Sequence, residues 1–228
     1  MSLILAFETA EHICSVALFE SGQLLAFEED REANSHSAHL FTLVEKLMNQ
    51  QGKELKELDA IAVNIGPGSY TGLRIACSAA KGVCYSLDIP VLGLTSMEIL
   101  ANAYVQTESC ENRDVLACML DARRMEVYVR YFDHQTKPLS EPEAVILETN
   151  MSLPISFDGD LHTIGSGALK ASEIGYHQKA KYPKSIKLHA MHMGPLAEKA
   201  WRQKNFLDTA YFEPKYLKEF FFTPSKKG

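Results

Sequence analysis

Three glycines lie close together between an apolar stretch at 59–64 and a segment of helical character at 73–87. Glycine serves where the backbone takes a positive φ or where another group approaches closely, and proline fixes one φ beside it. Backbone N–H groups at the start of a helix bind anions, so this junction could bind a phosphate. Ser69 or Thr71 could also cap the helix that follows. The turn consists of Gly66, Pro67, Gly68, Ser69, Tyr70, Thr71 and Gly72.

This turn differs from the common phosphate-binding and nucleophile motifs. The Walker A loop needs a lysine directly after its last glycine, and Leu73 stands there. The nucleophile elbow needs a glycine two residues to either side of its serine, whereas Pro67 and Thr71 occupy those positions around Ser69. The spacing of the dinucleotide-binding fingerprint fails as well. Two alternatives stay about equally open: a phosphate contact, and a turn whose glycines only set its geometry.

Two histidine pairs, His36 with His39 and His189 with His192, have the spacing of metal ligands. Neither pair has a nearby cysteine or carboxylate as a third ligand, and His-x-x-His arises easily by chance. The odd number of cysteines and the lack of Cys-x-x-Cys argue against a disulfide framework or a thiolate metal site. We therefore expect no metal in this chain, and histidines at the surface or at an interface. The cysteines are Cys14, Cys77, Cys84, Cys110 and Cys118.

Another charged cluster lies at 121–124, where a carboxylate and two guanidiniums share one expected turn. Asp121 and Arg123 could contact a phosphate or the carboxylate of a partner. An exposed turn whose charges satisfy each other is the commoner outcome, and it remains the alternative.

The first half of the chain predicts a mixed sheet covered on both faces. Three strands joined by short turns form an antiparallel meander, and two further strands alternate with helices, which implies parallel pairing beyond the meander. Thr95 and Glu98 have the spacing of a capping box at the start of a helix that runs to 103. The expected strands are 3–7, 13–19, 23–32, 59–64 and 89–94, and the expected long helices are 36–49 and 73–87.

The polar stretch 106–114 is the best candidate for a linker between two lobes. After it, strands and helices follow in the same order but in reduced form. We therefore predict an N-terminal lobe at 1–105 and a smaller C-terminal lobe at 106–228, with the tail 205–228 able to pack back on the first lobe. The expected elements are strands at 115–120, 126–132, 144–147 and 162–165, and helices after 168 and at 193–204.

The composition of the 228 residues is that of an ordinary globular protein, with a net charge of −6. A protein that grips nucleic acid by itself needs clustered lysine and arginine, so direct binding of nucleic acid is disfavoured. The apolar run at 3–7 is far too short to span a bilayer and lacks the features of a signal peptide. We expect a cytoplasmic, reduced protein without membrane contact.

The segment 73–87 is small and apolar on most faces, and Arg74 and Lys81 are its only charges. A helix that is apolar all round is either buried or covered by a second protein. Together with the helix at 36–49 it predicts a binding surface for a partner. The residues expected at this interface are His36, His39, Leu40, Leu43, Leu73, Arg74, Ala76, Cys77, Ala80 and Lys81.

The chain resembles the TsaB (YeaZ) family, densely over 1–102 and sparsely over 133–228. The central stretch 59–75 is the most specific part of the resemblance. Supporting segments are 4–10, 14–18, 36–37, 80–82, 89–90, 93, 121–124, 126–128 and 214–217.

The resemblance implies an α/β fold of the actin-like, sugar kinase-like (ASKHA) class with two lobes, mixed sheets flanked by helices and a reduced second lobe. It also implies a non-catalytic subunit in the synthesis of threonylcarbamoyladenosine at position 37 of tRNA. Such a subunit pairs with the catalytic relative TsaD through its first two helices, and the ATPase TsaE docks near their junction. Alone, it often forms a homodimer through the same surface, and it would meet tRNA only indirectly.

No cofactor is implied for the chain by itself, because ATP or ADP and metal belong to the partner subunits or to the junction. Thr9, Asp121 and Arg123 are the residues that could lie near such a nucleotide. The chain departs from active members of the superfamily at Glu8-Thr9-Ala10, where the phosphate grip is weakened. The alternatives are an independent ATPase or peptidase of the same fold, and a nucleotide-binding regulator.

Overall fold

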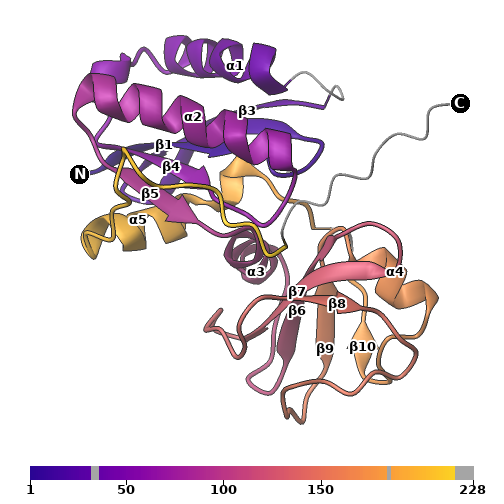
Figure 1. Cartoon of the computed structure of the whole chain (residues 1–228). Coiled ribbons are helices and arrows are strands. Elements are labelled where there is room, and N and C mark those ends of the chain that lie inside the picture. Colours follow the sequence, from indigo (N-terminus) through magenta and orange to yellow (C-terminus); the bar gives the residue numbers. More distant parts are fainter. Residues whose placement is uncertain (32–35, 184–185, 219–228) are drawn as a thin grey trace, which may run out of the picture.

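The computed structural model describes residues 1–31, 36–183 and 186–218, without the side chains of 36–38. Two lobes are visible, each built on a five-stranded sheet (Figure 1). None of the helices in these described residues is both long enough and apolar enough to cross a lipid bilayer. All five cysteines are free thiols.

The first sheet has the strand order β3-β2-β1-β4-β5. Its first three strands pair antiparallel, while β4 and β5 run parallel to β1. The strands β1 and β4 are buried along their whole length, as expected for strands that are covered on both faces. The predicted mixed sheet is thereby confirmed. The strands are β1 (Leu3–Glu8), β2 (Cys14–Glu20), β3 (Gln23–Asp30), β4 (Ala60–Asn64) and β5 (Val91–Leu94).

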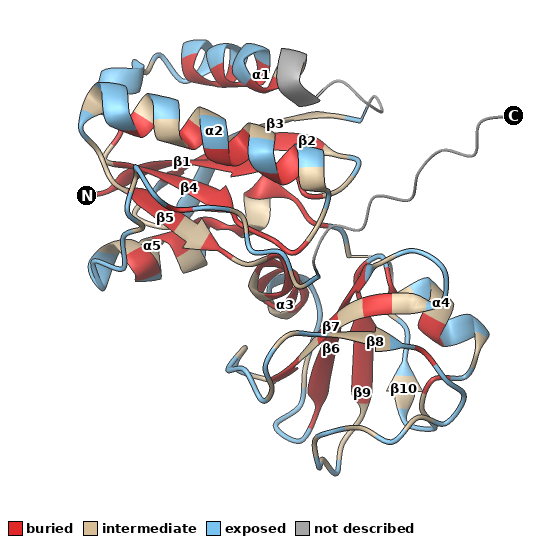
Figure 2. Ribbon diagram, viewed as in Figure 1, coloured by how far each residue is buried: buried red, intermediate tan, exposed pale blue. Residues whose placement is uncertain are grey.

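Helices cover both faces of this sheet (Figure 1). The helices α1 (His36–Gln50) and α2 (Tyr70–Leu87) lie side by side on one face, and a short 3-10 turn, η1 (Leu55–Glu57), follows α1. The opposite face carries α5 (Gly194–Arg202) and the 3-10 turn η2 (Ala190–His192), and α3 (Ser96–Thr107) packs against both of them. Figure 2 shows that α3 is buried along much of its length, whereas α1 and α2 expose their outer faces.

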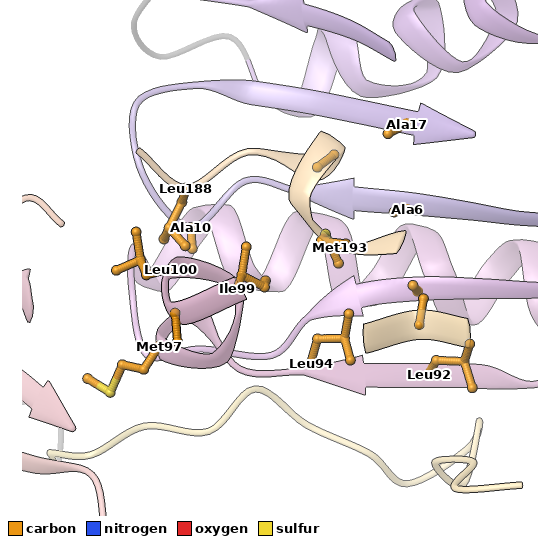
Figure 3. Packing of buried hydrophobic residues seen from close by; sticks show 14 of the residues in the cluster. Ala6, Ala10, Ala17, Leu92, Leu94, Met97, Ile99, Leu100, Leu188 and Met193 are labelled. Carbon is orange, nitrogen blue, oxygen red and sulfur yellow. The ribbon is translucent and has the colours of Figure 1, made fainter. Parts of the chain in front are cut away.

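The core below the sheet joins the two lobes. Ala6 and Ala17 project from the strands, and their small side chains leave room for α3 and for the segment around η2 (Figure 3). Ile99 and Leu100 of α3 enter the same cluster, which continues into strands of the second lobe. The side chains of α3 therefore belong to one hydrophobic cluster that extends through both lobes. Second-lobe members of the cluster are Leu116, Cys118, Leu120, Phe132 and Ile164.

The second sheet repeats the topology of the first. Its order, β10-β9-β6-β7-β8, becomes that of the first sheet when β6 to β10 are matched with β1 to β5. One helix, α4 (Ala168–Glu173), follows β9, but the described segment 147–160 between β8 and β9 contains no helix where the first lobe has α1. The reduced second lobe and the actin-like fold class are thus as expected. The strands are β6 (Val115–Asp121), β7 (Glu126–Asp133), β8 (Glu143–Ile146), β9 (Leu161–Ile164) and β10 (Ala180–Lys181).

The predicted boundary of the second lobe, 106–228, is wrong at its C-terminal end. After β10 the chain returns to the first lobe, where Ala197 and Ala200 of α5 are buried against the first sheet. The segment that follows α5 also lies on the first lobe. The Leu207 N–H donates to the Val91 carbonyl at 2.9 Å, and the Lys215 N–H donates to the Ile65 carbonyl at 2.7 Å. The physical reason is that the face of the first sheet opposite α1 and α2 needs an apolar cover.

Some element ends also differ from the sequence prediction. The helix α2 begins at Tyr70 instead of 73, because Ser69 caps it and the glycine at 72 continues the helix. The helix α3 runs four residues past the predicted end at 103, and β10 was not predicted. Asn34 and Ser35, whose side chains suit a helix cap, and the aromatic run at 220–222 lie outside the described residues.

Candidate functional site

The glycine turn at the end of β4 is packed against the turn between β1 and β2. A β carbon on Gly72 would lie 2.0 Å from the carbonyl oxygen of Thr9, and one on Gly68 would lie 2.6 Å from the β carbon of Ala10. The Ser69 N–H donates to the Ala10 carbonyl at 2.7 Å, and the Gly72 N–H donates to the Ser69 hydroxyl at 3.2 Å. These amides therefore bind groups of the chain itself.

The other residues of the turn also have partners or positions that set its shape. Gly66 has a φ of 109° and lies so close to the C-terminal segment that a β carbon would be 2.7 Å from the Lys215 carbonyl oxygen. The Gly66–Pro67 peptide bond is cis, and the Pro67 carbonyl accepts a hydrogen bond from the Ser96 hydroxyl. Thr71 is exposed on the first turn of α2, so Ser69 is the cap and Thr71 is not.

The acidic residue of the first hairpin, Glu8, is turned into the protein. Its carboxylate accepts hydrogen bonds from the Ala10 N–H and from the Asn64 side chain, both at 2.6 Å. Asn64 in turn bonds Ser96, which fixes β1, β4 and the start of α3 together. Burial of the carboxyl group raises the pKa of Glu8 to about 7, although these two hydrogen bonds act in the opposite direction.

Thr9 does not present its hydroxyl to a ligand. The side chain is fully buried, and its hydroxyl donates to the Gly72 carbonyl at 2.7 Å. The Thr9 hydroxyl is therefore not presented to a ligand in this conformation, and proximity of Thr9 to a nucleotide stays a prediction. The cause is the close packing of the glycine turn on the first hairpin, which buries the side chains of Glu8 and Thr9.

The charge of Asp121 is paired within the chain, by a lysine of α4 that lies outside the turn. The Asp121 carboxylate accepts from the Lys170 ammonium and from the Arg123 N–H, both at 2.6 Å. The Arg123 side chain is exposed, and its φ is 70°. Proximity of these two residues to a nucleotide stays a prediction.

A groove of about 640 Å³ lies between α1 and α2 on the outer face of the first lobe. Phe41 is 50% exposed on one wall, and Ser78, Gly82 and Ser86 follow one another at helical spacing on the other. Small residues at this spacing allow a second helix to approach closely, and an exposed apolar surface marks an interaction site. The groove is lined by Leu40, Phe41, Leu55, Ile75, Ser78, Ala79, Gly82, Val83, Ser86 and Leu87.

Six of the residues expected at a partner interface face the first sheet and not the outer surface. They are buried under α1 and α2 because the apolar stripe of each helix packs on the sheet, so they hold the helices in place, and their contact with a partner stays a prediction. Only Leu40 also lines the base of the groove. These residues are Leu40, Leu43, Leu73, Ala76, Cys77 and Ala80.

The charged residues expected there have partners within the chain. The Arg74 guanidinium lies 4.2 Å from the centre of the Tyr70 ring and donates to the Tyr216 hydroxyl at 3.1 Å. The Lys81 ammonium donates to the Ala210 carbonyl at 3.1 Å, so the C-terminal segment lies along one side of α2. His39 bonds the Asp30 carboxylate, and the side chain of His36 lies outside the described residues.

Three groove residues, Leu55, Ile75 and Val83, were not expected at an interface from the sequence. A signal was present, because Phe41 stands outside the main apolar stripe of its helix and a large aromatic residue there needs a cover.

Comparison with known proteins agrees with the fold and the motifs. Residues 30–206 match the family model described as TsaD, tRNA N6-adenosine threonylcarbamoyltransferase. The Escherichia coli tRNA threonylcarbamoyladenosine biosynthesis protein TsaB is 31% identical over 173 residues, which is 72% of this chain and 71% of that one. The Haemophilus influenzae protein of the same name is 25% identical over 232 residues, covering 94% of this chain and 93% of the relative.

Solved structures give the same result. A crystal structure from Pseudomonas aeruginosa, described as an uncharacterized protein with similarity to peptidase YEAZ, superimposes with a TM-score of 0.85 at 28% identity. The superposition covers 96% of this chain and all of the other. A second structure, described as YeaZ from the same organism, has a TM-score of 0.82 at 28% identity and covers 95% of this chain. The chain therefore belongs to the TsaB (YeaZ) family, whose members take part in the biosynthesis of threonylcarbamoyladenosine in tRNA.

Proposed function

We propose that this chain is a non-catalytic partner subunit that pairs with a TsaD-like catalytic subunit and activates it. The observation that carries the proposal is the apolar groove between α1 and α2, with Phe41 half exposed on its wall. An interface core of this kind combines an aromatic anchor with small residues that admit a partner helix. Pairing would hold the catalytic subunit in its active conformation.

The interior of the first lobe supports a scaffold role. Glu8 and Thr9 stand where an actin-like enzyme has its phosphate-contacting hairpin, yet their side chains bond Asn64, Ala10 and Gly72. The side chains of Glu8 and Thr9 are thus used within the fold and are not presented to a phosphate. The net charge of −6 supports a contact with tRNA only through the partner.

Further parts of the proposal follow from the same groove. Alone, the chain would form a homodimer that buries this surface, and the dimer would compete with the catalytic subunit. A TsaE-like ATPase would dock beside the junction of the two subunits, where ATP or ADP and a metal would be bound. The site of action would be the cytoplasm, where tRNA is modified.

The test is a tRNA modification assay with TsaD, TsaE and the carbamoyladenylate synthase, run with and without this chain. Modification should need the chain, and Ala79→Arg should abolish both modification and co-purification with TsaD. Ala79 lines the groove and is only half buried, whereas arginine at the fully buried Ala76 would disrupt the core. Leu169→Arg is the matched control, because Leu169 is 69% exposed on α4 of the second lobe.

Two outcomes would overturn the proposal. Undiminished modification without the chain would show that no activating subunit is needed. Hydrolysis of ATP or cleavage of TsaD by the purified chain would favour the alternative, an independent ATPase or peptidase. Pairing of Ala79→Arg at unchanged affinity would move the interface away from the groove.

A further inference from the structure

Three side chains of metal-binding type meet between the linker of the two lobes and the second sheet. Cys110 lies in the linker after α3, Asp114 stands directly before β6, and His162 lies in β9. The Cys110 sulfur, a carboxylate oxygen of Asp114 and a ring nitrogen of His162 all lie within 4.8 Å of one another. The distance from His162 Nε2 to Asp114 Oδ2 is 3.0 Å. Two ligands of one tetrahedral ion lie about 3–4 Å apart, because metal–ligand bonds are about 2.0–2.3 Å long, so small shifts of these side chains would place all three around one ion.

The groups around the cluster fix its ligand atoms. The second ring nitrogen of His162, Nδ1, lies 2.8 Å from the Tyr104 hydroxyl. Asp114 Oδ1 accepts the Asp160 N–H, and Asp114 Oδ2 accepts the Glu111 N–H, both at 2.9 Å. A histidine that binds a metal almost always donates its other N–H to a neighbouring oxygen, and a binding carboxylate is likewise hydrogen-bonded. The arrangement here has both features.

The electrostatic surroundings favour a cation. The carboxylates of Asp114 and Asp133 both act on the half-buried Cys110 thiol, so the fixed charge near the sulfur is negative. Asp160 also lies beside the cluster, where its side chain forms an ion pair with Lys181. His162 and Asp114 are both buried, while Cys110 is half-buried. An ion could enter from the side of the linker.

We propose that Cys110 Sγ, Asp114 Oδ2 and His162 Nε2 bind one divalent transition-metal ion of the zinc class. A sulfur, an imidazole and a carboxylate together suit Zn²⁺, whereas Mg²⁺ and Ca²⁺ prefer oxygen ligands alone. Three protein ligands leave a fourth position for water at the half-buried side. The ion ties the linker to the second sheet and so sets the position of that lobe against α3.

The alternative is a hydrogen-bonded triad of Tyr104, His162 and Asp114 that needs no ion. In that case Cys110 has no role, and its replacement changes nothing that depends on a metal. The two cases therefore differ in the effect of a single half-buried side chain.

The experiment uses the full chain, freed of metal with a chelator and titrated with Co²⁺ and then with Zn²⁺. The wild-type chain should bind one equivalent of Co²⁺, with the near-ultraviolet band of a thiolate–cobalt bond, and Zn²⁺ should displace it. Zn²⁺ should also raise the Tm. Cys110→Ser should lose the thiolate band and bind at least about tenfold more weakly.

Two matched controls separate the site from other cysteines and histidines. Cys77→Ser changes a cysteine on α2, and His12→Gln changes an exposed histidine in the first hairpin; both should bind as the wild type does. His162→Gln should lose binding, and Cys110→Ser covers the case in which that buried substitution prevents folding. Absence of the thiolate band in the wild type, or its persistence in Cys110→Ser, would overturn the proposal.

Discussion

The Thr9 hydroxyl donates a hydrogen bond of 2.7 Å to the carbonyl of Gly72. The Thr9 carbonyl oxygen lies only 2.0 Å from the position that a β carbon of residue 72 would occupy. The first hairpin and the start of α2 are thereby in direct backbone contact. Glycine is required at 72 because of this approach and not because of its φ. The turn therefore positions α2, and α2 in turn forms one wall of the groove.

Replacing Gly72 with alanine should destabilise the chain strongly. The added β carbon would lie 2.0 Å from a backbone oxygen, so the hairpin and the helix must move apart. Overpacking of a core typically costs about 1–3 kcal/mol, and a clash with rigid backbone belongs at the upper end. The free energy of unfolding, measured by urea denaturation, should fall by roughly 3 kcal/mol.

Gly82→Ala is the control in the same helix. A β carbon at 82 meets nothing within 4 Å, and alanine is favoured over glycine inside a helix by about 0.5–1 kcal/mol. This variant should therefore be as stable as the wild type or more stable. If the two substitutions changed the free energy of unfolding equally, helix propensity, and not the contact with Thr9, would explain the effect of replacing Gly72.

Much of the first lobe could be predicted because its signals are local. The apolar runs, the glycine turn and the spacing of Thr95 and Glu98 each depend on neighbours in the sequence. The return of α5 to the first sheet could not be predicted in this way. Its apolar face fits either lobe, and only the assembled fold reveals which sheet face lacks a cover.

The candidate sites were predicted less well, for the same reason. The helices α1 and α2 were expected to form a binding surface, but residues such as Ala76 and Ala80 point at the sheet. Periodicity identifies an apolar stripe and does not say whether the stripe or its margin faces solvent. Cys110 and His162 are far apart in the sequence, and parallel pairing of β6 with β9 brings them together.

Thr95→Ala should weaken the start of α3. The Glu98 N–H points at the Thr95 hydroxyl, and the Glu98 carboxylate accepts the Thr95 N–H at 3.0 Å, as in a capping box. Loss of such a cap costs about 1 kcal/mol, which should appear as a lowered Tm in a thermal scan. Glu98→Gln keeps an acceptor for the Thr95 N–H and should cost less. The reverse order of the two variants would contradict the assignment of the cap.

Phe41→Ala should weaken pairing with the catalytic subunit without unfolding the chain. The ring is 50% exposed on the groove wall, so its removal leaves the core of the first lobe intact. Aromatic anchors at the centre of an interface contribute about 2 kcal/mol or more, so the Kd measured by calorimetry should rise about thirtyfold or more. Ile146→Ala, at a residue 64% exposed on β8, should leave the Kd unchanged. A Kd equally insensitive to both changes would exclude the groove as the interface.

Glu8 should make the folded state less stable as the pH rises. Burial raises the pKa of Glu8 from its ordinary value of 4.5 to about 7, so the folded chain holds a proton that the unfolded chain releases. This contribution to stability is complete below pH 4.5 and is lost between pH 4.5 and 7, with a total of roughly 3 kcal/mol. His192 acts in the opposite direction, because burial and then His189 lower its pKa from 6.5 to about 4.

Glu8→Gln separates the two effects, since glutamine cannot ionise. The free energy of unfolding, measured in urea from about pH 4 to about pH 8, should rise for the variant relative to the wild type as the pH increases. The new side chain still offers an oxygen to the Ala10 N–H, but its amide group faces the Asn64 amide, so a constant cost is expected at every pH. For His192→Gln, the free energy of unfolding should fall relative to the wild type as the pH increases, because the variant no longer gains stability between pH 4 and 6.5. A difference between Glu8→Gln and wild type that is independent of pH would mean that the pKa of Glu8 is the same in the folded chain as in the unfolded chain.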